Sequence, residues 1–121
     1  RKTVKEYIKK GNNFKISKNA TVEEIINKID YHKAGFAMIT HKEKLHGVVT
    51  DGDIRRLVLN RNRNLININP ITCTPDETLL QMYSKVSATE KHVQFIPIVD
   101  QENKLLGFID LNNVNGEINE F

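Results

Sequence analysis

Apolar residues recur with the period of a helix in two places along the chain. In residues 16–29 and 73–86, apolar side chains are spaced by three and four positions and therefore fall on one helix face. The matched pairs are Val22 with Leu79, Ile25 with Met82, and Ile29 with Val86. A capping box, in which two side chains bond free backbone groups of the first turn, is predicted to begin each helix. The two boxes are Thr21-x-x-Glu24 and Thr78-x-x-Gln81.

Short apolar runs after each helix indicate buried strands. The runs are FAMIT (36–40), LHGVVT (45–50), IPIVD (96–100) and LLGFID (105–110). The polar turns HKEK and QENK join them in pairs, and each copy closes with a short helical stretch, 54–59 or 111–114. We align Thr40 with Asp100, 60 positions on, whereas the first helices are offset by 57 positions. Three additional residues are therefore expected between helix and strand in the second copy, near 88–90.

The repeat predicts an α/β (α+β) fold made of two β-α-β-β-α motifs. A unit of about 50 residues buries too little apolar surface to be stable alone. We therefore expect the two copies to pack with pseudo-twofold symmetry and a cleft between them. In the first residues, Val4, Tyr7 and Ile8 predict one helix face, and Gly11 is expected to end that helix. The predicted segments are an N-terminal linker or helix (1–13), a first motif (14–62), a second motif (63–115) and a C-terminal tail (116–121).

Composition and charge argue against several classes of function. The net charge of the 121 residues is only +3, and the basic residues are spread along the chain, whereas a nucleic-acid binder gathers them on one face. No apolar run approaches the ~18 residues of a membrane-spanning helix, so no membrane association is expected. Cys73 is the single cysteine, which precludes an internal disulfide and fits a reducing, cytoplasmic location. We expect it to be a small buried hydrophobic residue.

The stretch GVVTDGDIRR (47–56) carries the most specific candidate chemistry. Thr50 and Asp53 fall at a predicted helix start, where free backbone amides and the helix dipole suit a phosphate. The Asp53 carboxylate can accept hydrogen bonds from two sugar hydroxyls. Arg55 and Arg56 can add contacts to a phosphate, or they can lie on the surface or at a dimer interface. Alternatively, Thr50 and Asp53 simply cap the helix.

Metal and catalytic sites are not predicted. Asp51-Gly52-Asp53 resembles part of a calcium loop, but it lacks the further acids and the closing glutamate. The histidines do not pair with Cys73 or with each other at ligand spacing, although His92 can line the cleft. Neither a nucleophile triad nor a pair of glutamates suggests hydrolysis. We therefore expect no catalytic residue, no metal and no catalytic cofactor in this chain.

The order and spacing of these pieces resemble a tandem pair of cystathionine-β-synthase (CBS) domains, also called a Bateman module. In that family a threonine-capped helix is followed by x-P-V-V-D and then by G-h-h-[ST]-x-x-D, where h is apolar. The second copy supplies IPIVD (96–100) and the first supplies GVVTDGD (47–53). The string TDGDIRR is similar to the C-terminal CBS pair of KpsF/GutQ-type arabinose-5-phosphate isomerases, which follows a sugar-isomerase (SIS) domain. Similar strings occur in CBS pairs attached to sugar-phosphate nucleotidyltransferases.

The resemblance implies a regulatory module that binds a nucleotide or nucleotide-sugar and is not itself an enzyme. Thr50 and Asp53 would hold the phosphate and the ribose, and Arg55 would add a contact. Backbone groups before the first helix and at the first long strand would hold the base, at Ile16, Ser17, Lys18, Phe36 and Ala37. The implied ligands are an adenine nucleotide or a CMP-sugar, and the implied partners are an upstream SIS domain and a second copy in a homodimer. A nucleotidyltransferase parent and a ligand-free dimerisation module are the alternatives.

The second copy departs from the family pattern. Asp110 stands in place of the threonine and Asn113 in place of the aspartate, with Pro97 on the preceding strand. A carboxylate at Asp110 would repel a phosphate, and this repulsion is stronger where water is excluded. We therefore expect the second site to be empty or to bind a neutral or cationic group, so that one nucleotide binds per chain.

Overall fold

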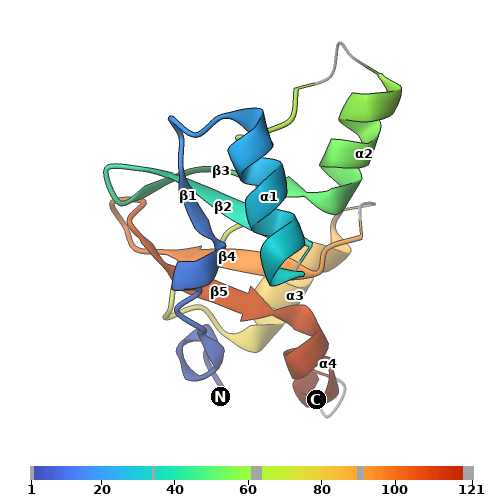
Figure 1. The fold of residues 1–121 in the computed structure, drawn as a ribbon. Helices are drawn as coiled ribbons and strands as arrows, with labels where there is room; N and C mark the ends of the chain where they lie inside the picture. Colours follow the sequence, from blue (N-terminus) through green and yellow to red (C-terminus); the bar gives the residue numbers. More distant parts are fainter. Residues whose placement is uncertain (1, 34, 61–63, 90–91, 119–121) are drawn as a thin grey trace. The chain divides into compact units, whose positions relative to one another are not determined.

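A computed structural model describes residues 2–33, 35–60, 64–89 and 92–118 (Figure 1). The chain divides into two compact units, which we name the first-motif unit (Gly11–Pro70) and the second-motif unit (Arg1–Lys10 with Ile71–Phe121). The division differs from the sequence-based boundaries, because residues 1–10 belong with the second motif and the break near residue 62 falls at Pro70. Residues 61–63, around the predicted boundary between the motifs, and the predicted tail residues 119–121 lie outside the described residues.

The first-motif unit is a three-stranded sheet with two helices. Its sheet has the order β1 (Lys15–Ser17), β2 (Phe36–His41), β3 (Lys44–Thr50), with β1 parallel and β3 antiparallel to β2. The helices are α1 (Val22–His32) between β1 and β2, and α2 (Asp51–Leu59) after β3 (Figure 1). Ile25 and Ile29 of α1 pack with Ala37, Ile39 and Val49 of the sheet in one hydrophobic core. Both predicted strands are thus confirmed, as are Ile25 and Ile29 of the predicted helix face, whereas Val22 is 48% exposed. Helix α2 begins three residues before the predicted 54.

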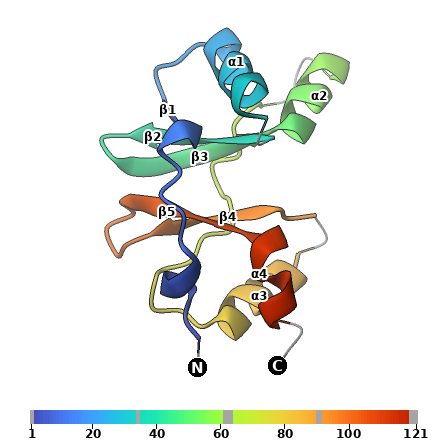
Figure 2. The same cartoon turned by 60° about the horizontal axis from the view of Figure 1, so that its bottom comes forward.

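The second-motif unit repeats this arrangement. Its strands β4 (Phe95–Val99) and β5 (Leu105–Asp110) are antiparallel, and Cys73 forms a parallel bridge with Ile98 as Ile16 does with Ile39. Figure 2 shows α3 (Leu79–Ser87) and α4 (Leu111–Ile118) side by side. Helix α4 continues beyond the predicted 114 and includes the first residues of the predicted tail. The predicted order strand–helix–strand–strand–helix is therefore complete in the first motif, and in the second a single bridge at Cys73 takes the place of the first strand.

The alignment of Thr40 with Asp100 was wrong by one residue. Phe36 pairs with Thr50 and Phe95 pairs with Asp110, so β4 corresponds to β2 at an offset of 59, whereas β5 corresponds to β3 at an offset of 60. The equivalent of Asp100 is therefore His41. The reason is that one of the additional residues lies in the turn before β5, where the Asp100 N–H donates to Lys104 O (3.0 Å).

Both predicted capping boxes are present. The Thr21 hydroxyl accepts from the Glu24 N–H (3.1 Å), and the Glu24 carboxylate accepts from the Thr21 N–H (2.9 Å). The corresponding distances for Thr78 and Gln81 are 3.1 and 2.8 Å. These reciprocal bonds satisfy backbone donors that have no partner within the helix, and they fix where α1 and α3 begin.

The predicted N-terminal helix is shorter than expected and ends differently. A 3₁₀ helix, η1 (Val4–Tyr7), ends at Ile8, whose backbone is extended. Gly11 does not end this helix; it adopts a left-handed conformation before a second 3₁₀ turn, η2 (Asn12–Phe14). The chain extends at Ile8 because the Lys9 N–H and C=O both bond to Phe108 of β5, at 2.9 and 2.8 Å. The N-terminal segment (residues 2–10) is therefore part of the second-motif unit.

Two glycines allow backbone segments to approach the hairpins closely. Val48 of β3 exchanges two backbone hydrogen bonds with Asn67, as Phe108 does with Lys9. A Cβ atom on Gly47 would lie 2.6 Å from the Asn67 oxygen, and one on Gly107 would overlap the Lys9 oxygen. The glycines thus stand where a side chain would block the additional edge segment of each sheet.

Candidate functional site

Thr50 and Asp53 are positioned by the junction between β3 and α2. The Thr50 backbone is extended, and its hydroxyl accepts from the Asp53 N–H at 3.2 Å. One Asp53 oxygen, Oδ2, accepts from both the Thr50 N–H (2.9 Å) and the Thr50 hydroxyl (3.0 Å). The pair therefore forms a complete capping box at the start of α2. The hydroxyl hydrogen that was expected to face a phosphate is directed at Asp53.

The second Asp53 oxygen lies outside this box and contacts a different residue. Oδ1 accepts from Arg56 Nη2 at 2.8 Å, and the Asp53 side chain is 13% exposed while that of Arg56 is 49% exposed. The guanidinium lies against Gly52, since a Cβ there would be 3.2 Å from Nη1. Arg55 was the predicted ligand contact, but its side chain is exposed, and the arginine that donates to Asp53 is Arg56. The spacing of three positions on a helix is the signal that identifies Arg56.

Phe36 and Ala37 lie next to this junction. Phe36 is the cross-strand partner of Thr50, and Ala37 is the partner of Val49. The Phe36 ring is nearly buried, with its centroid 5.1 Å from that of Phe14. The Ala37 side chain is fully buried in the core, so its side chain is not available to a ligand.

Ile16, Ser17 and Lys18 lie toward the opposite end of β2. Ile16 and Ser17 pair with Ile39 and Thr40, and the Lys18 N–H donates to Thr40 O at 2.8 Å. Phe36 and Thr40 are four positions apart in β2, a distance of about 13 Å at the usual rise per residue of a strand. The structure therefore brings Phe36, Thr50 and Asp53 together but places the Ile16–Lys18 group a strand length away.

The Lys18 end of β2 is basic. The pKa of His41 is lowered by partial loss of solvent and then by the positive charges of Lys18, Lys42 and His46. The corresponding end of the second motif carries the acids Asp76, Asp100 and Glu102. Thr74, Pro75, Asp76, Asp100, Gln101 and Glu102 line an open hollow of about 390 Å³ there.

The junction of the second motif has the same backbone arrangement but different side-chain contacts. The Leu111 N–H donates to Gln94 O (3.0 Å), as the Asp51 N–H donates to Gly35 O (2.9 Å). Asp110 Oδ1 accepts from the Asn112 N–H (3.0 Å), and Asp110 Oδ2 lies 3.8 Å from Lys9 Nζ. Sequence reasoning missed Lys9, because it precedes Asp110 by about 100 positions and no local pattern joins the two residues.

The other predicted residues of the second site contribute differently. Asn113 is exposed in the first turn of α4. Pro97 is fully buried in β4, and its carbonyl accepts from the Cys73 N–H at 3.2 Å. Pro97 is therefore part of the sheet and its core.

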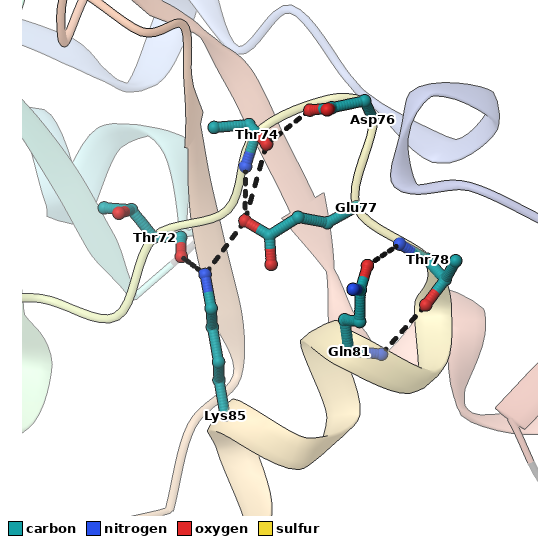
Figure 3. A network of polar contacts seen from close by, with 7 residues as sticks. All are labelled: Thr72, Thr74, Asp76, Glu77, Thr78, Gln81 and Lys85. Carbon is teal, nitrogen blue, oxygen red and sulfur yellow. Dashed lines mark hydrogen bonds and ion pairs between the residues drawn. The ribbon is translucent and has the colours of Figure 1, made fainter.

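A polar network holds residues 72–78 onto α3 (Figure 3). Lys85 Nζ donates to Thr72 O and to Glu77 Oε1, both at 2.9 Å, and the same Glu77 oxygen accepts from the Thr74 N–H at 3.0 Å. Burial acts to raise the pKa of Glu77, but the bonds from Lys85 and Thr74 outweigh it and leave that pKa below its ordinary value.

Cys73 lies beside this network and is 1% exposed, as predicted for a small buried hydrophobic residue. Burial, together with the nearby charge of Glu77, raises the pKa of its thiol to about 11. The thiol is therefore protonated at neutral pH and is a poor nucleophile.

Among residues 2–33, 35–60, 64–89 and 92–118, no cluster of three or more His, Cys, Asp or Glu side chains is arranged to hold a metal ion. Over the same residues, no helix combines the length and apolar character needed to cross a membrane.

The chain belongs to the CBS domain family. The family model for the CBS domain matches residues 4–60 and 63–120, so two tandem copies cover nearly the whole chain. CBSX2 in complex with AMP has a TM-score of 0.82 and 19% identity to this chain, covering 99% of it and 98% of CBSX2. The CBS domain pair of protein MJ0100, in complex with 5′-methylthioadenosine and S-adenosyl-L-methionine, has a TM-score of 0.82 and 20% identity, covering 98% and 96%. At these identities the likeness establishes the fold.

Curated relatives are enzymes of several kinds. Homoserine O-acetyltransferase of Methanohalobium evestigatum is 26% identical over 69% of this chain and 17% of its own length. Inosine-5′-monophosphate dehydrogenase of Methanocaldococcus jannaschii is 27% identical over 82% and 20%, respectively. The probable arabinose 5-phosphate isomerase of Haemophilus influenzae is 28% identical over 67% and 26%. The chain thus spans about a quarter or less of the length of these relatives.

Proposed function

We propose that this chain is a regulatory module that binds an adenine nucleotide at the β3–α2 junction of its first motif. The observation that carries the proposal is the Asp53 carboxylate, which keeps one oxygen outside the capping box at the start of α2. Membership of the CBS family supports it, as do the adenine compounds named with CBSX2 and MJ0100. These two structures contain adenine compounds, so we favour an adenine nucleotide over a CMP-sugar.

The contacts follow from the chemistry of the described groups. The Asp53 oxygen outside the capping box accepts a ribose hydroxyl, and the positive N-terminal end of α2 faces the phosphate. Phe36 lies beside Thr50 and provides apolar surface near the sugar. The backbone of Ile16, Ser17 and Lys18, a strand length away, receives the base.

One nucleotide per chain is the expected stoichiometry. The second motif presents Asp110 where the first presents Thr50, and a carboxylate at that position opposes a phosphate. Lys9 offsets this charge in part, but the ammonium and the carboxylate are both partly exposed and 3.8 Å apart, so solvent weakens the effect.

The module regulates a catalytic domain in a longer cytoplasmic chain. An arabinose-5-phosphate isomerase with an upstream SIS domain is the parent we favour, from the string TDGDIRR and the Haemophilus influenzae relative. A ligand changes the activity of such a domain only through a difference in its affinity for the domain's states. A homodimer is the expected assembly, and a nucleotidyltransferase is the alternative parent.

A ligand-free dimerisation module is the second candidate. One observation favours it: Tyr31, Val58 and Leu59, near the C-terminal ends of α1 and α2, expose more than 70% of their surface. Large apolar side chains mark an association surface where they form a contiguous exposed patch.

Thermal unfolding with AMP, ADP, ATP, S-adenosylmethionine and CMP-sugars tests the proposal. An adenine nucleotide at 100 times its dissociation constant should add about 2.7 kcal/mol, a shift of several degrees. Asp53→Ala should abolish that shift. Glu24→Ala is the matched control, because it breaks the capping box of α1 in the same unit and should leave the ligand shift intact. If no nucleotide shifts the wild-type midpoint at millimolar concentration, the dimerisation module becomes the better explanation.

A further inference from the structure

The position of Arg56 relative to α2 is electrostatically unusual. The N-terminal end of a helix carries partial positive charge, which favours anions and disfavours a guanidinium. Arg56 nevertheless extends back along the helix to Gly52, in the first turn, and its charge is compensated by Asp53 Oδ1 at 2.8 Å. An anion bound at this end would interact favourably with both the guanidinium and the positive end of the helix dipole.

The Arg56 contact also limits what Asp53 can do. Oδ2 already accepts two hydrogen bonds from Thr50, so Oδ1 is the oxygen that can take a sugar hydroxyl. A hydroxyl that approaches Oδ1 must share it with Arg56 Nη2 or replace it. Replacement without a new acceptor would leave the guanidinium next to the positive helix end without its partner, which is unfavourable.

We propose that Arg56 exchanges partners when a nucleotide binds: its guanidinium moves from the Asp53 carboxylate to the phosphate. Through this exchange Arg56 makes the site select nucleotides over nucleosides. This inference rests on the proposed function. A phosphate offers two oxygens to the planar guanidinium fork, and its arrival frees Asp53 Oδ1 for the ribose. A nucleoside supplies no such acceptor, so it competes with Arg56 for Asp53 and binds weakly.

The affinities of AMP and adenosine, measured by titration calorimetry at one fixed salt concentration, test the exchange. Arg56→Met removes the charge and keeps most of the apolar stem. It should lower the ratio of AMP affinity to adenosine affinity by about tenfold or more, because AMP loses a charged contact while adenosine gains a free carboxylate oxygen. Arg55→Met is the matched control on the same helix, and it should leave the ratio within about threefold of wild type.

The outcomes separate the two proposals. The exchange is overturned if the wild type binds AMP but Arg56→Met changes the ratio of AMP affinity to adenosine affinity by less than tenfold. That result leaves the proposed function standing. If the wild type binds neither AMP nor adenosine at millimolar concentration, the proposed function fails and the exchange fails with it. Both arginine side chains are exposed, so neither substitution should disturb the core. An unchanged unfolding midpoint verifies that each variant is folded.

Discussion

The two motifs follow the same backbone path at the strand–helix junction but close it with different side chains. In the first motif Thr50 caps the helix as a neutral hydroxyl, and the carboxylate that completes the box keeps one oxygen for Arg56. In the second motif the carboxylate of Asp110 is itself the cap and lies near Lys9. The same local fold thus carries a neutral hydroxyl at one junction and a carboxylate at the other. In the function we propose, this cap residue sets whether the junction binds an anion, without a change of fold.

The first helices of the motifs also differ, although their sequence patterns match. Val22 of α1 is 48% exposed, whereas its equivalent Leu79 of α3 is fully buried. The N-terminal segment accounts for the difference, because the Leu79 N–H donates to Lys2 O and Val4 joins the same core cluster as Leu79. A segment distant in sequence therefore turns one of two equivalent positions into a core position.

The largest effect should come from truncating the buried member of this pair. Leu79→Ala should cost about 3 kcal/mol of unfolding free energy, since it leaves a cavity in a closed core. Val22→Ala should change stability by less than about 0.5 kcal/mol, because that side chain is already half exposed. Urea denaturation of both variants checks the contrast, and equal costs would contradict the role assigned to the N-terminal segment.

A double-mutant cycle sharpens the same comparison. Val4→Ala alone should cost about 2 kcal/mol, because Val4 is fully buried. Combined with Leu79→Ala it should cost less than the sum, since residues that share a cavity are coupled. Strict additivity in urea denaturation would indicate that the two side chains do not share one core.

The edge glycines should show the next largest effect. Gly107→Ala should destabilise the protein by about 2–3 kcal/mol and Gly47→Ala by about 2 kcal/mol, because a Cβ overlaps a backbone carbonyl in each case. Gly52→Ala provides a control: its Cβ meets only the mobile end of Arg56, and alanine favours a helix over glycine by about 1 kcal/mol. The midpoint of thermal unfolding should therefore be higher than that of the wild type for Gly52→Ala and lower for the two edge variants.

The two junction caps should differ by a smaller amount. Thr50→Ala removes the two hydrogen bonds of the hydroxyl to Asp53 and keeps the backbone one, and it should cost about 1.5 kcal/mol. Asp110→Ala removes one bond and should cost about 0.5 kcal/mol. Thr78→Ala, in a box of similar geometry, is the reference and should resemble Thr50→Ala. A larger loss from Asp110→Ala in denaturant titrations would show that the Lys9 contact contributes more than its 3.8 Å separation suggests.

The Glu77 network should make the second motif sensitive to acid. Because the pKa of Glu77 is lowered in the folded protein, its contribution to stability is present above its ordinary pKa of 4.5 and is lost as the pH falls below that value. Glu77→Gln should therefore be less stable than wild type at pH 7 and should lose less stability between pH 5 and pH 3. Parallel curves of unfolding midpoint against pH would contradict this assignment.

The sequence determined the elements and their order, because those depend on local interactions. Capping boxes at Thr21 and Thr78 and the apolar runs of the strands are each readable within a few residues, and the repeat supplied the motif twice. The pair Thr50 and Asp53 was predicted for the same reason, because residues three positions apart at the start of a helix are close enough to form a capping box. Arg56 could have been found by the same spacing, and the preference for Arg55 was a choice between neighbours.

Tertiary structure alone decided which residues from distant segments meet. Lys9 lies near Asp110, Val4 joins the core beneath Leu79, and Gly47 and Gly107 face backbones that no local pattern connects to them. Strand β4 corresponds to β2 at an offset of 59 because one of the three additional residues lies in the turn between β4 and β5, and not between α3 and β4. Such contacts depend on how segments far apart in sequence pair at sheet edges, and periodicity along one segment carries no information about its partner.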